Sequence, residues 1–391
     1  MKKKPLIIII SSAAAVLIAV ASLVTFLPVS YRYDEGLIKK NESYAVKVLK
    51  EEKYTTLSNG RDDFKILGFT DTHLDTYRRK STVSLEMVIR NVVNEKPDLV
   101  VFDGDIITSS FNRRRANQFA DVMTKLGVYW TAVLGNHEGD NNRSVSRQEM
   151  IEIYAKSPYC LVETSQKTTK NGSIVDGYGN HVINIVDSKN TITQSLYLID
   201  GGAYMSDEDL KKYMDEIPDA HHNGYDYIKQ SQIDWYSETV KDVESLAGSP
   251  VKSMMFTHIP LPEFEEAYNL IGEGKAEEGD SILFGDKREV ICHPGHNSGM
   301  FSKIKELDST KCVVSGHDHI NNFVLSYQGV RLGYCQSSGY SSYNVVTKGL
   351  EKELLKGYSV LNINEHGDVG WKNVRNADIW PELQDKILKL Y

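Results

Sequence analysis

Residues 98–105 read DLVVFDGD, and this stretch indicates the fold class. Residues 99–102 form an unbroken apolar run, which is typical of a strand buried on both faces of a sheet. The run ends at an Asp-Gly-Asp turn whose last residue is Asp105. We therefore expect a central strand that delivers acidic side chains to one edge of a sheet.

The flanking sequence repeats the alternation of strand and helix. Short apolar strands are predicted at 65–70 and 129–134, and helices with one apolar face are predicted at 81–94 and 112–126. This β-α-β-α-β order predicts an α/β domain with a parallel or mixed sheet covered by helices. In such folds the ligand site lies beyond the carboxyl ends of the strands.

The remainder of the chain continues the same domain. Its patterns predict a helix at 231–246, a hairpin at 358–373, a tail helix at 381–390, and strands at 181–186, 195–200, 251–257, 312–315, 323–327 and 330–334. Residues 164–180 are predicted to form a hairpin or surface loop, and the Gly-rich, acidic stretch 272–296 an insertion near the site mouth. No linker divides residues 61–391, which we interpret as one large domain.

Composition excludes several classes of protein. The chain has 391 residues, of which 41% are hydrophobic and 25% charged, so a disordered chain and a disulfide-rich miniprotein are both excluded. The net charge of −8 argues against nonspecific nucleic-acid binding, so we expect no nucleic-acid partner. Four cysteines permit zero, one or two disulfides, and the sequence does not choose among the pairings of Cys160, Cys292, Cys312 and Cys335.

Residues 1–31 predict contact with a membrane. Three lysines precede an uncharged run from Pro5 to Tyr31, which is long enough to cross a bilayer as one helix. We interpret the segment as a single-pass signal anchor that leaves the large domain outside the cell membrane. The alternative is a signal peptide cleaved before Ser22, which would make the protein secreted. Residues 32–60 are interpreted as a juxtamembrane linker.

Five clusters of polar residues follow predicted strands. They are Asp71-Thr72-His73, Gly104-Asp105, Gly135-Asn136-His137-Glu138, His258, and Gly316-His317-Asp318-His319. Carboxylate, amide and imidazole groups together suit divalent ions such as Mn²⁺, Fe²⁺ and Zn²⁺. The donors are too many for one ion, and they fit two ions that share the carboxylate of Asp105.

Two such ions would polarise a phosphoryl oxygen and activate a water molecule for attack on phosphorus. His137 is expected to protonate the leaving group as general acid. We expect Glu138 or Asp318 to orient His137 or a ligand imidazole, and the glycines at 104, 135 and 316 to allow sharp turns after the strands.

Each cluster alone also has a structural explanation, such as a turn, a helix cap or a buried histidine. Their common position at strand ends favours a metal site. We interpret His293 and His296 as surface loop residues in preference to substrate contacts. The run Arg113-Arg114-Arg115 is interpreted as a solvated basic face in preference to a phosphate contact.

The ordered clusters resemble those of the calcineurin-like metallophosphoesterase superfamily over residues 64–336. Finer features resemble its purple-acid-phosphatase-like branch: FTHIPLPEF at 256–264, NSGMF at 297–301, GHDHINN at 316–322 and SQIDW at 231–235. This resemblance implies a four-layer sandwich in which two mixed β-sheets are flanked by helices.

The resemblance also implies an assignment of ligands. One metal would take Asp71, His73, Asp105 and His319, and the other would take Asp105, Asn136, His258 and His317, with His137 as the acid. True purple enzymes carry a tyrosine where this chain has Thr108 and a glycine where it has His73. A purple colour is therefore not expected, and a manganese or mixed iron, zinc and manganese site is favoured.

The sequence thus predicts a metal-dependent phosphoric ester hydrolase that acts on phosphomonoesters by a metal-activated hydroxide. Two alternatives stay open: a phosphodiesterase or nucleotidase using the same site, and a non-catalytic cell-surface binding protein with this fold. The expected partner is a phosphorylated substrate whose class the sequence leaves open.

Overall fold

The computed structural model describes residues 33–39, 45–49, 53–75, 80–109, 112–140, 144–213, 215, 224–342 and 355–383. The predicted membrane segment, residues 1–31, lies outside these ranges. Within them, no helix combines the length and the apolar character that crossing a bilayer requires. The signal anchor and the cleaved signal peptide therefore both stay predictions.

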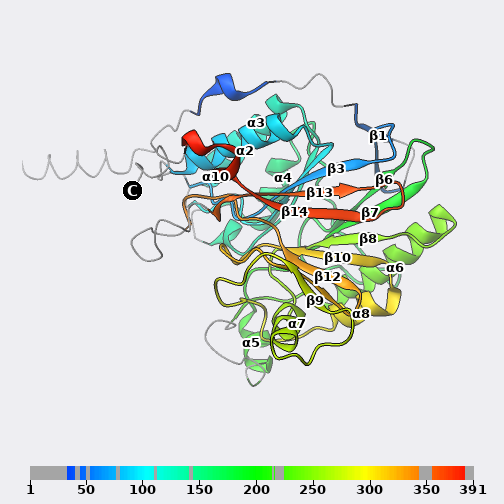
Figure 1. The fold of residues 1–391 in the computed structure, drawn as a ribbon. Coiled ribbons are helices and arrows are strands. Elements are labelled where there is room, and N and C mark those ends of the chain that lie inside the picture. The colour runs from blue at the N-terminus through cyan, green and yellow to red at the C-terminus, as the bar shows by residue number, and fades with distance from the viewer. Residues whose placement is uncertain are drawn as a thin grey trace, which may run out of the picture. The chain divides into compact units, whose positions relative to one another are not determined.

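The described strands form two sheets (Figure 1). The five-stranded sheet has the order β14 (Val369–Arg375), β13 (Gly357–Ile363), β3 (Phe64–Phe69), β4 (Leu99–Asp103) and β5 (Trp130–Val133). The nine-stranded sheet has the order β1 (Lys47–Leu49), β2 (Thr55–Ser58), β6 (His181–Val186), β7 (Ile192–Leu198), β8 (Ser253–Phe256), β10 (Thr310–Ser315), β12 (Val330–Tyr334), β11 (Val324–Tyr327) and β9 (Ser281–Phe284).

Both sheets are mixed. In the smaller sheet β3, β4 and β5 run parallel, whereas β13 pairs antiparallel with β3 and β14. In the larger sheet β7, β8, β10 and β12 run parallel, and β11 pairs antiparallel with β12 and β9. Helical crossovers join β3 to β4, β4 to β5 and β7 to β8, whereas β10 and β12 are joined through β11. The carboxyl ends of the parallel strands lie at one edge of each sheet.

Helices cover the outer face of each sheet. The smaller sheet is covered by α2 (Lys80–Glu95), α3 (Asn112–Leu126) and α4 (Arg147–Tyr154). The larger sheet is covered by α6 (Gln230–Ala247), α7 (Glu263–Gly272) and α8 (Met300–Leu307). Shorter described elements are η1 (Glu35–Leu37), η2 (His137–Gly139), α5 (Asp207–Tyr213), α10 (Asn376–Ile379) and η5 (Pro381–Leu383).

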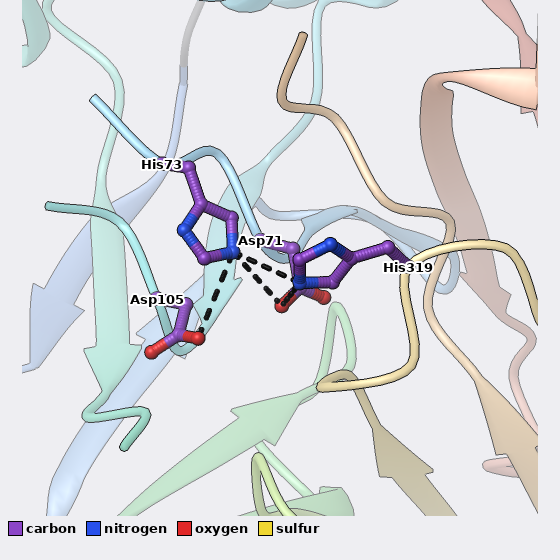
Figure 2. A group of neighbouring side chains, drawn as sticks. All are labelled: Asp71, His73, Asp105 and His319. Atoms are coloured by element: carbon purple, nitrogen blue, oxygen red, sulfur yellow. Dashed lines mark hydrogen bonds and ion pairs between the residues drawn. The ribbon is translucent and has the colours of Figure 1, made fainter. Parts of the chain in front are cut away.

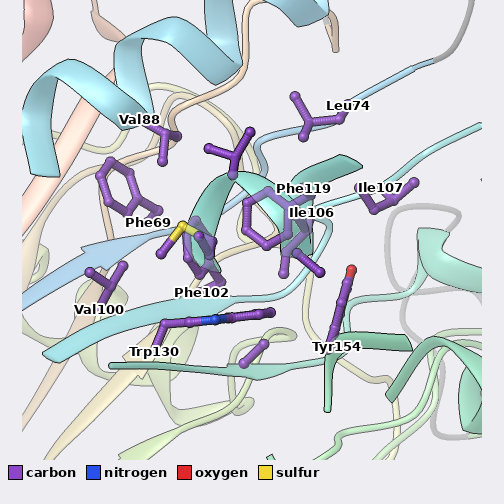
Figure 3. Packing of buried hydrophobic residues seen from close by; sticks show 14 of the residues in the cluster. Phe69, Leu74, Val88, Val100, Phe102, Ile106, Ile107, Phe119, Trp130 and Tyr154 are labelled. Atoms are coloured by element: carbon purple, nitrogen blue, oxygen red, sulfur yellow. The ribbon is translucent and has the colours of Figure 1, made fainter. Parts of the chain in front are cut away.

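Strand β4 shows how one apolar run serves two layers. Successive side chains of a strand point to opposite faces. Leu99 and Val101 pack between the two sheets, whereas Val100 and Phe102 pack toward the helices. Phe102 stacks on Phe69 with ring centroids 5.4 Å apart (Figure 3). Helices, sheet, sheet and helices thus form four layers, which confirms the predicted fold class.

The structure refines several boundaries. The segment expected to be a linker contributes β1 and β2, and β2 pairs in parallel with β6. The insertion 272–296 contains β9, which pairs with β11. The tail is a 3₁₀ turn at Pro381–Leu383, and the remainder of the predicted tail helix lies outside the described residues. All four cysteines are free thiols.

Candidate metal centre

Five loops carry the donor residues, and each loop directly follows a strand. Asp71 follows β3, Asp105 follows β4, Asn136 follows β5, His258 follows β8 and His317 follows β10. Backbone hydrogen bonds join these loops to one another. The Asp71 N–H donates to the Gly104 carbonyl at 3.1 Å, and the Gly316 N–H donates to the His258 carbonyl at 3.0 Å. The carboxyl ends of the strands thus bring residues distant in sequence into one site.

The first group of donors consists of Asp71, His73, Asp105 and His319 (Figure 2). All four residues are buried. The Nε2 atoms of His73 and His319 lie 3.0 Å apart, and His319 Nε2 lies 3.2 Å from Asp71 Oδ1. Ligand atoms about 2.0–2.2 Å from a common ion have separations of this order. The spacing therefore suits a single ion among these side chains.

The second group consists of Asp105, His258 and His317, with ligand atoms within 4.8 Å of one another. His258 Nε2 lies 3.3 Å from Asp105 Oδ2. Asn136 precedes His137 in the loop after β5. Asp105 fixes this loop, because its Oδ1 accepts the His137 N–H at 2.9 Å. Asp105 is a member of both groups, as a carboxylate shared by two ions would be.

Several donor atoms in the site are buried without a hydrogen-bond partner in the described part of the chain. They are Asp71 Oδ1, Asp105 Oδ2, Asn136 Oδ1, His258 Nε2 and His317 Nε2. Leaving a buried polar atom unsatisfied costs about 1–3 kcal/mol. All five atoms are acceptors or ring nitrogens, which suits divalent cations. The residues present therefore fit a pair of metal ions.

The two carboxylates use their oxygens in the same way. Asp71 Oδ2 accepts the His317 N–H at 3.1 Å, and Asp105 Oδ1 accepts the His137 N–H. Each aspartate thus orients a neighbouring loop with one oxygen and leaves the other for a ligand. His258 is held in a similar manner, because its Nδ1 donates to the Asp103 carbonyl at 2.7 Å and directs Nε2 into the site.

The backbone of the site is strained. Asp71, His73, Asp105 and His317 have φ values of 50°, 48°, 51° and 73°. This left-handed conformation costs a non-glycine residue about 1–2 kcal/mol. Such strain concentrates at functional sites, where the surrounding structure holds the residue in place.

The glycines have two different functions. Gly104 has a φ of 83°, as the prediction of a sharp turn requires. Gly135 and Gly316 do not have a positive φ, so a left-handed backbone is not what requires glycine there. A Cβ atom on Gly135 would lie 2.1 Å from Asp105 Oδ1, and one on Gly316 would lie 1.9 Å from Thr70 Oγ1. Close packing of the loops is therefore what requires these two glycines.

His137 lies at the open side of the site. Its side chain is 35% exposed, and its Nε2 lies 4.0 Å from Asp105 Oδ2. Its Nδ1 donates to the carboxylate of Asp140. Burial lowers the pKa of His137, but the hydrogen bond to Asp140 and the charge of Asp105 outweigh it and raise the pKa to about 9. Both interactions favour the protonated imidazole.

Two of the proposed ligand histidines have a lowered pKa, in contrast to His137. Burial lowers the pKa of His73 to about 4 and that of His317 to about 3. Burial thus favours the neutral imidazole, which offers a lone pair to a metal ion. At His258 the charge of Asp105 outweighs burial and raises the pKa to about 10.

The expectation that Glu138 or Asp318 orients a site histidine is wrong. The carboxylate of Glu138 accepts the Ile106 N–H at 2.7 Å and the Gly135 N–H at 2.8 Å, and so joins two loops. Asp318 accepts the Cys292 N–H at 3.2 Å and the amide of Asn321. Asp140 holds His137 instead.

The other residues weighed from the sequence lie in structural contacts. Arg113 pairs with Glu149 at 2.6 Å, and buried Arg115 donates to the Asp75 carbonyl at 3.1 Å. His293 is buried 3.2 Å from Glu265 Oε2, which differs from the surface loop position that we expected. His296 stacks on Tyr213 with ring centroids 3.7 Å apart.

Sequence reasoning missed three residues that position the site. Tyr204 Oη lies 3.1 Å from Asn136 Nδ2, so the phenol accepts from the amide and fixes its oxygen. Tyr225 places its ring at 4.6 Å from the ring of His317. Arg147 donates to the Gly135 carbonyl and pairs with buried Asp200. These residues lie outside the strand-end clusters, so no motif indicated them.

Comparison with known proteins agrees with this geometry. The model of the family described as calcineurin-like phosphoesterase matches residues 64–321, a range that includes all the donor residues. The chain is 31% identical over 314 residues to "Probable inactive purple acid phosphatase 14" of Arabidopsis thaliana, covering 76% of this chain and 71% of that protein.

A second Arabidopsis thaliana relative, "Probable inactive purple acid phosphatase 29", is 29% identical over 318 residues, which are 77% of this chain and 74% of that protein. A solved structure of a dimetal phosphatase from Danio rerio is 15% identical with a TM-score of 0.48, covering 79% of this chain and 95% of that one. Since the family model spans most of the chain, this protein belongs to the calcineurin-like phosphoesterase family.

Proposed function

We propose that this protein is a two-metal phosphoesterase that hydrolyses phosphomonoesters. The observation that carries the proposal is the position of Asp105, which belongs to both groups of buried donors. A carboxylate shared by two ions a few ångströms apart is the arrangement that two-metal hydrolysis requires. Six of the seven donors expected from the sequence belong to these two groups, which supports the proposal.

Each part of the site has a task in this proposal. Two divalent ions, when bound, would supply Lewis acidity and lower the pKa of a water molecule toward neutrality. The pKa of His137 is raised and its side chain lies at the open side, where it can donate a proton to the leaving oxygen. Asp140 holds that imidazole in place from its Nδ1 side.

The ions we propose are manganese, or a mixture of iron, zinc and manganese. Imidazole, amide and carboxylate donors suit these borderline ions better than calcium or magnesium. Thr108 stands where true purple enzymes carry a metal-binding tyrosine, so the phenolate that produces their colour is absent at this position.

A second candidate is a non-catalytic binding protein, because two relatives carry the word "inactive" in their names. The residues of this chain favour the enzyme, since the proposed ligands Asp71, Asn136 and His258 and the proposed acid His137 all lie at the site. The place we propose for the activity is the outer face of the cell membrane, supported by the three lysines that precede the uncharged run.

Metal analysis and a substrate panel test the proposal on one preparation. We expect two transition-metal ions per chain and faster hydrolysis of p-nitrophenyl phosphate than of bis-p-nitrophenyl phosphate. Preference for the diester would indicate a phosphodiesterase. Asp105→Asn removes the shared carboxylate and is expected to abolish both metal binding and activity. Asp308→Asn is the matched control, since Asp308 is exposed.

Bound metal without turnover on any phosphate ester would favour the non-catalytic protein. Failure of the wild-type chain to retain transition metals would contradict the proposed site itself.

A further inference from the structure

Tyr33, the first residue that the structure describes, is packed in the hydrophobic core of the domain. Tyr33 is only 9% exposed and belongs to the hydrophobic cluster that includes residues of α2 and α3. Lys125 Nζ lies 3.4 Å from Tyr33 Oη, and the Asp34 N–H donates to Glu86 Oε1 at 3.0 Å. The chain is therefore attached to α2 and α3 from Tyr33 onward.

This attachment has a consequence for the predicted membrane anchor. The uncharged run ends at Tyr31, only two residues before Tyr33. Two residues of extended chain span about 7 Å. If the anchor is retained, this short length of chain limits the distance between the end of the uncharged run and the packed side chain of Tyr33.

A groove of about 730 Å³ lies next to this attachment point. Its lining is part cationic and part apolar, with Lys39, Arg90, Lys96, Leu37, Val93 and Trp380. None of the described residues that line it is acidic. Among the described residues, neither of the two lysines nor Arg90 forms an ion pair.

Nearby acidic residues are engaged elsewhere. Glu35 lies 3.3 Å from Lys125, and Glu95 lies 3.6 Å from Lys65. Glu86 accepts the Asp34 N–H. The positive charge of the groove is thus uncompensated by these carboxylates.

Trp380 is held at the groove from two sides. Its Nε1 donates to Asn91 Oδ1 at 2.9 Å, and the guanidinium of Arg90 lies 5.6 Å from the centre of its ring. Tryptophan is enriched at the interface between membrane and water, and basic side chains there attract anionic headgroups.

We propose that this groove binds the headgroup of an anionic phospholipid in the membrane that the amino-terminal segment enters. Lys39, Arg90 and Lys96 pair with the phosphate, and Leu37 and Trp380 contact the start of the acyl chains. Contact at this face gives the catalytic domain one orientation on the bilayer. The proposal rests on a retained anchor and is independent of the phosphoesterase activity.

The test uses the full chain in nanodiscs of phosphatidylcholine and phosphatidylglycerol. Bromine is placed on the acyl chains of either lipid, and the emission of Trp380 is obtained by difference from Trp380→Phe. We expect severalfold stronger quenching by brominated phosphatidylglycerol than by brominated phosphatidylcholine. The triple variant Lys39→Gln, Arg90→Gln and Lys96→Gln should remove this preference.

The matched control is Lys189→Gln, Lys241→Gln and Lys275→Gln, which removes the same charge from exposed positions that do not line the groove. It should keep the preference, and thermal unfolding shows whether each variant is folded. Equal quenching by the two lipids, or a preference that survives in the groove variant, would overturn the proposal. So would a mature chain that begins near Ser22 and does not enter the nanodiscs.

Discussion

The backbone N–H of His137 donates to Oδ1 of Asp105 at 2.9 Å, so the carboxylate placed to be shared by two metals also holds the loop of the proposed acid. The other oxygen of Asp105 faces His258 Nε2 at 3.3 Å. One side chain thus links the acid to the donors of both ions. Changes around Asp105 are therefore expected to affect metal binding and proton transfer together.

Replacing His258 by alanine should remove one metal position and leave the other. His258 belongs to the second donor group only, whereas the first group of four donors stays complete. We expect metal content to fall from two ions to one and kcat to fall by orders of magnitude. Inductively coupled plasma mass spectrometry and a phosphatase assay measure the two effects. His366→Ala, at an exposed histidine, is the control, and full activity in His258→Ala would contradict the assignment.

Gly135→Ala should impair the site more than its small size suggests. The new methyl group would lie 2.1 Å from Asp105 Oδ1, so the carboxylate or the loop must move. We expect at least a tenfold loss of activity with weaker metal retention, since displacement of catalytic groups by about 1 Å can lower rates by about 100-fold. Gly272→Ala is the matched control because a Cβ there meets no atom within 4 Å. Equal activity in the two variants would show that the contact is unimportant.

Asp140→Asn should change the pH dependence of catalysis. An acid must be protonated to act, so activity is lost as the pH rises through the pKa of His137, which is raised to about 9. Asparagine removes the charge that helps to raise this pKa, and the alkaline limb of the kcat profile should move to lower pH. Asp140→Glu, which keeps the charge, should restore the limb. A limb that stays in place in Asp140→Asn would assign the proton transfer to another group.

Tyr204→Phe should weaken one metal position without removing it. The variant deletes the acceptor that Asn136 Nδ2 meets at 3.1 Å, while the ring is kept. A single hydrogen bond of this kind contributes about 0.5–1.5 kcal/mol, so metal affinity should fall by up to about tenfold. Titration of the apoprotein with manganese measures the change. Tyr178→Phe, at another partly exposed tyrosine, should bind as the wild type does.

Local sequence pattern predicted much of the fold and of the candidate site. The apolar run Leu99–Phe102 indicated a strand buried on both faces because alternation of polar and apolar residues is absent. The clusters around Asp71, Asp105 and His317 could be placed at strand ends because the carboxyl ends of parallel strands meet at one edge. Residue type alone indicated the kind of ion, because the metal preference of imidazole and carboxylate groups depends on the groups themselves.

Other features depend on contacts between residues distant in sequence. Asp140 and Tyr204 hold His137 and Asn136, and neither shows a motif, because a second layer of hydrogen bonds needs only a donor or acceptor at the right place. The role of Gly135 arises from the approach of Asp105 across 30 residues of chain. Residues 32–60 were expected to be a linker, but Tyr33 packs onto α2 and α3. A short polar stretch of sequence does not indicate which surface of the domain it will contact. Periodicity and residue chemistry act locally and can be seen in the chain, whereas these positions follow from how the layers pack.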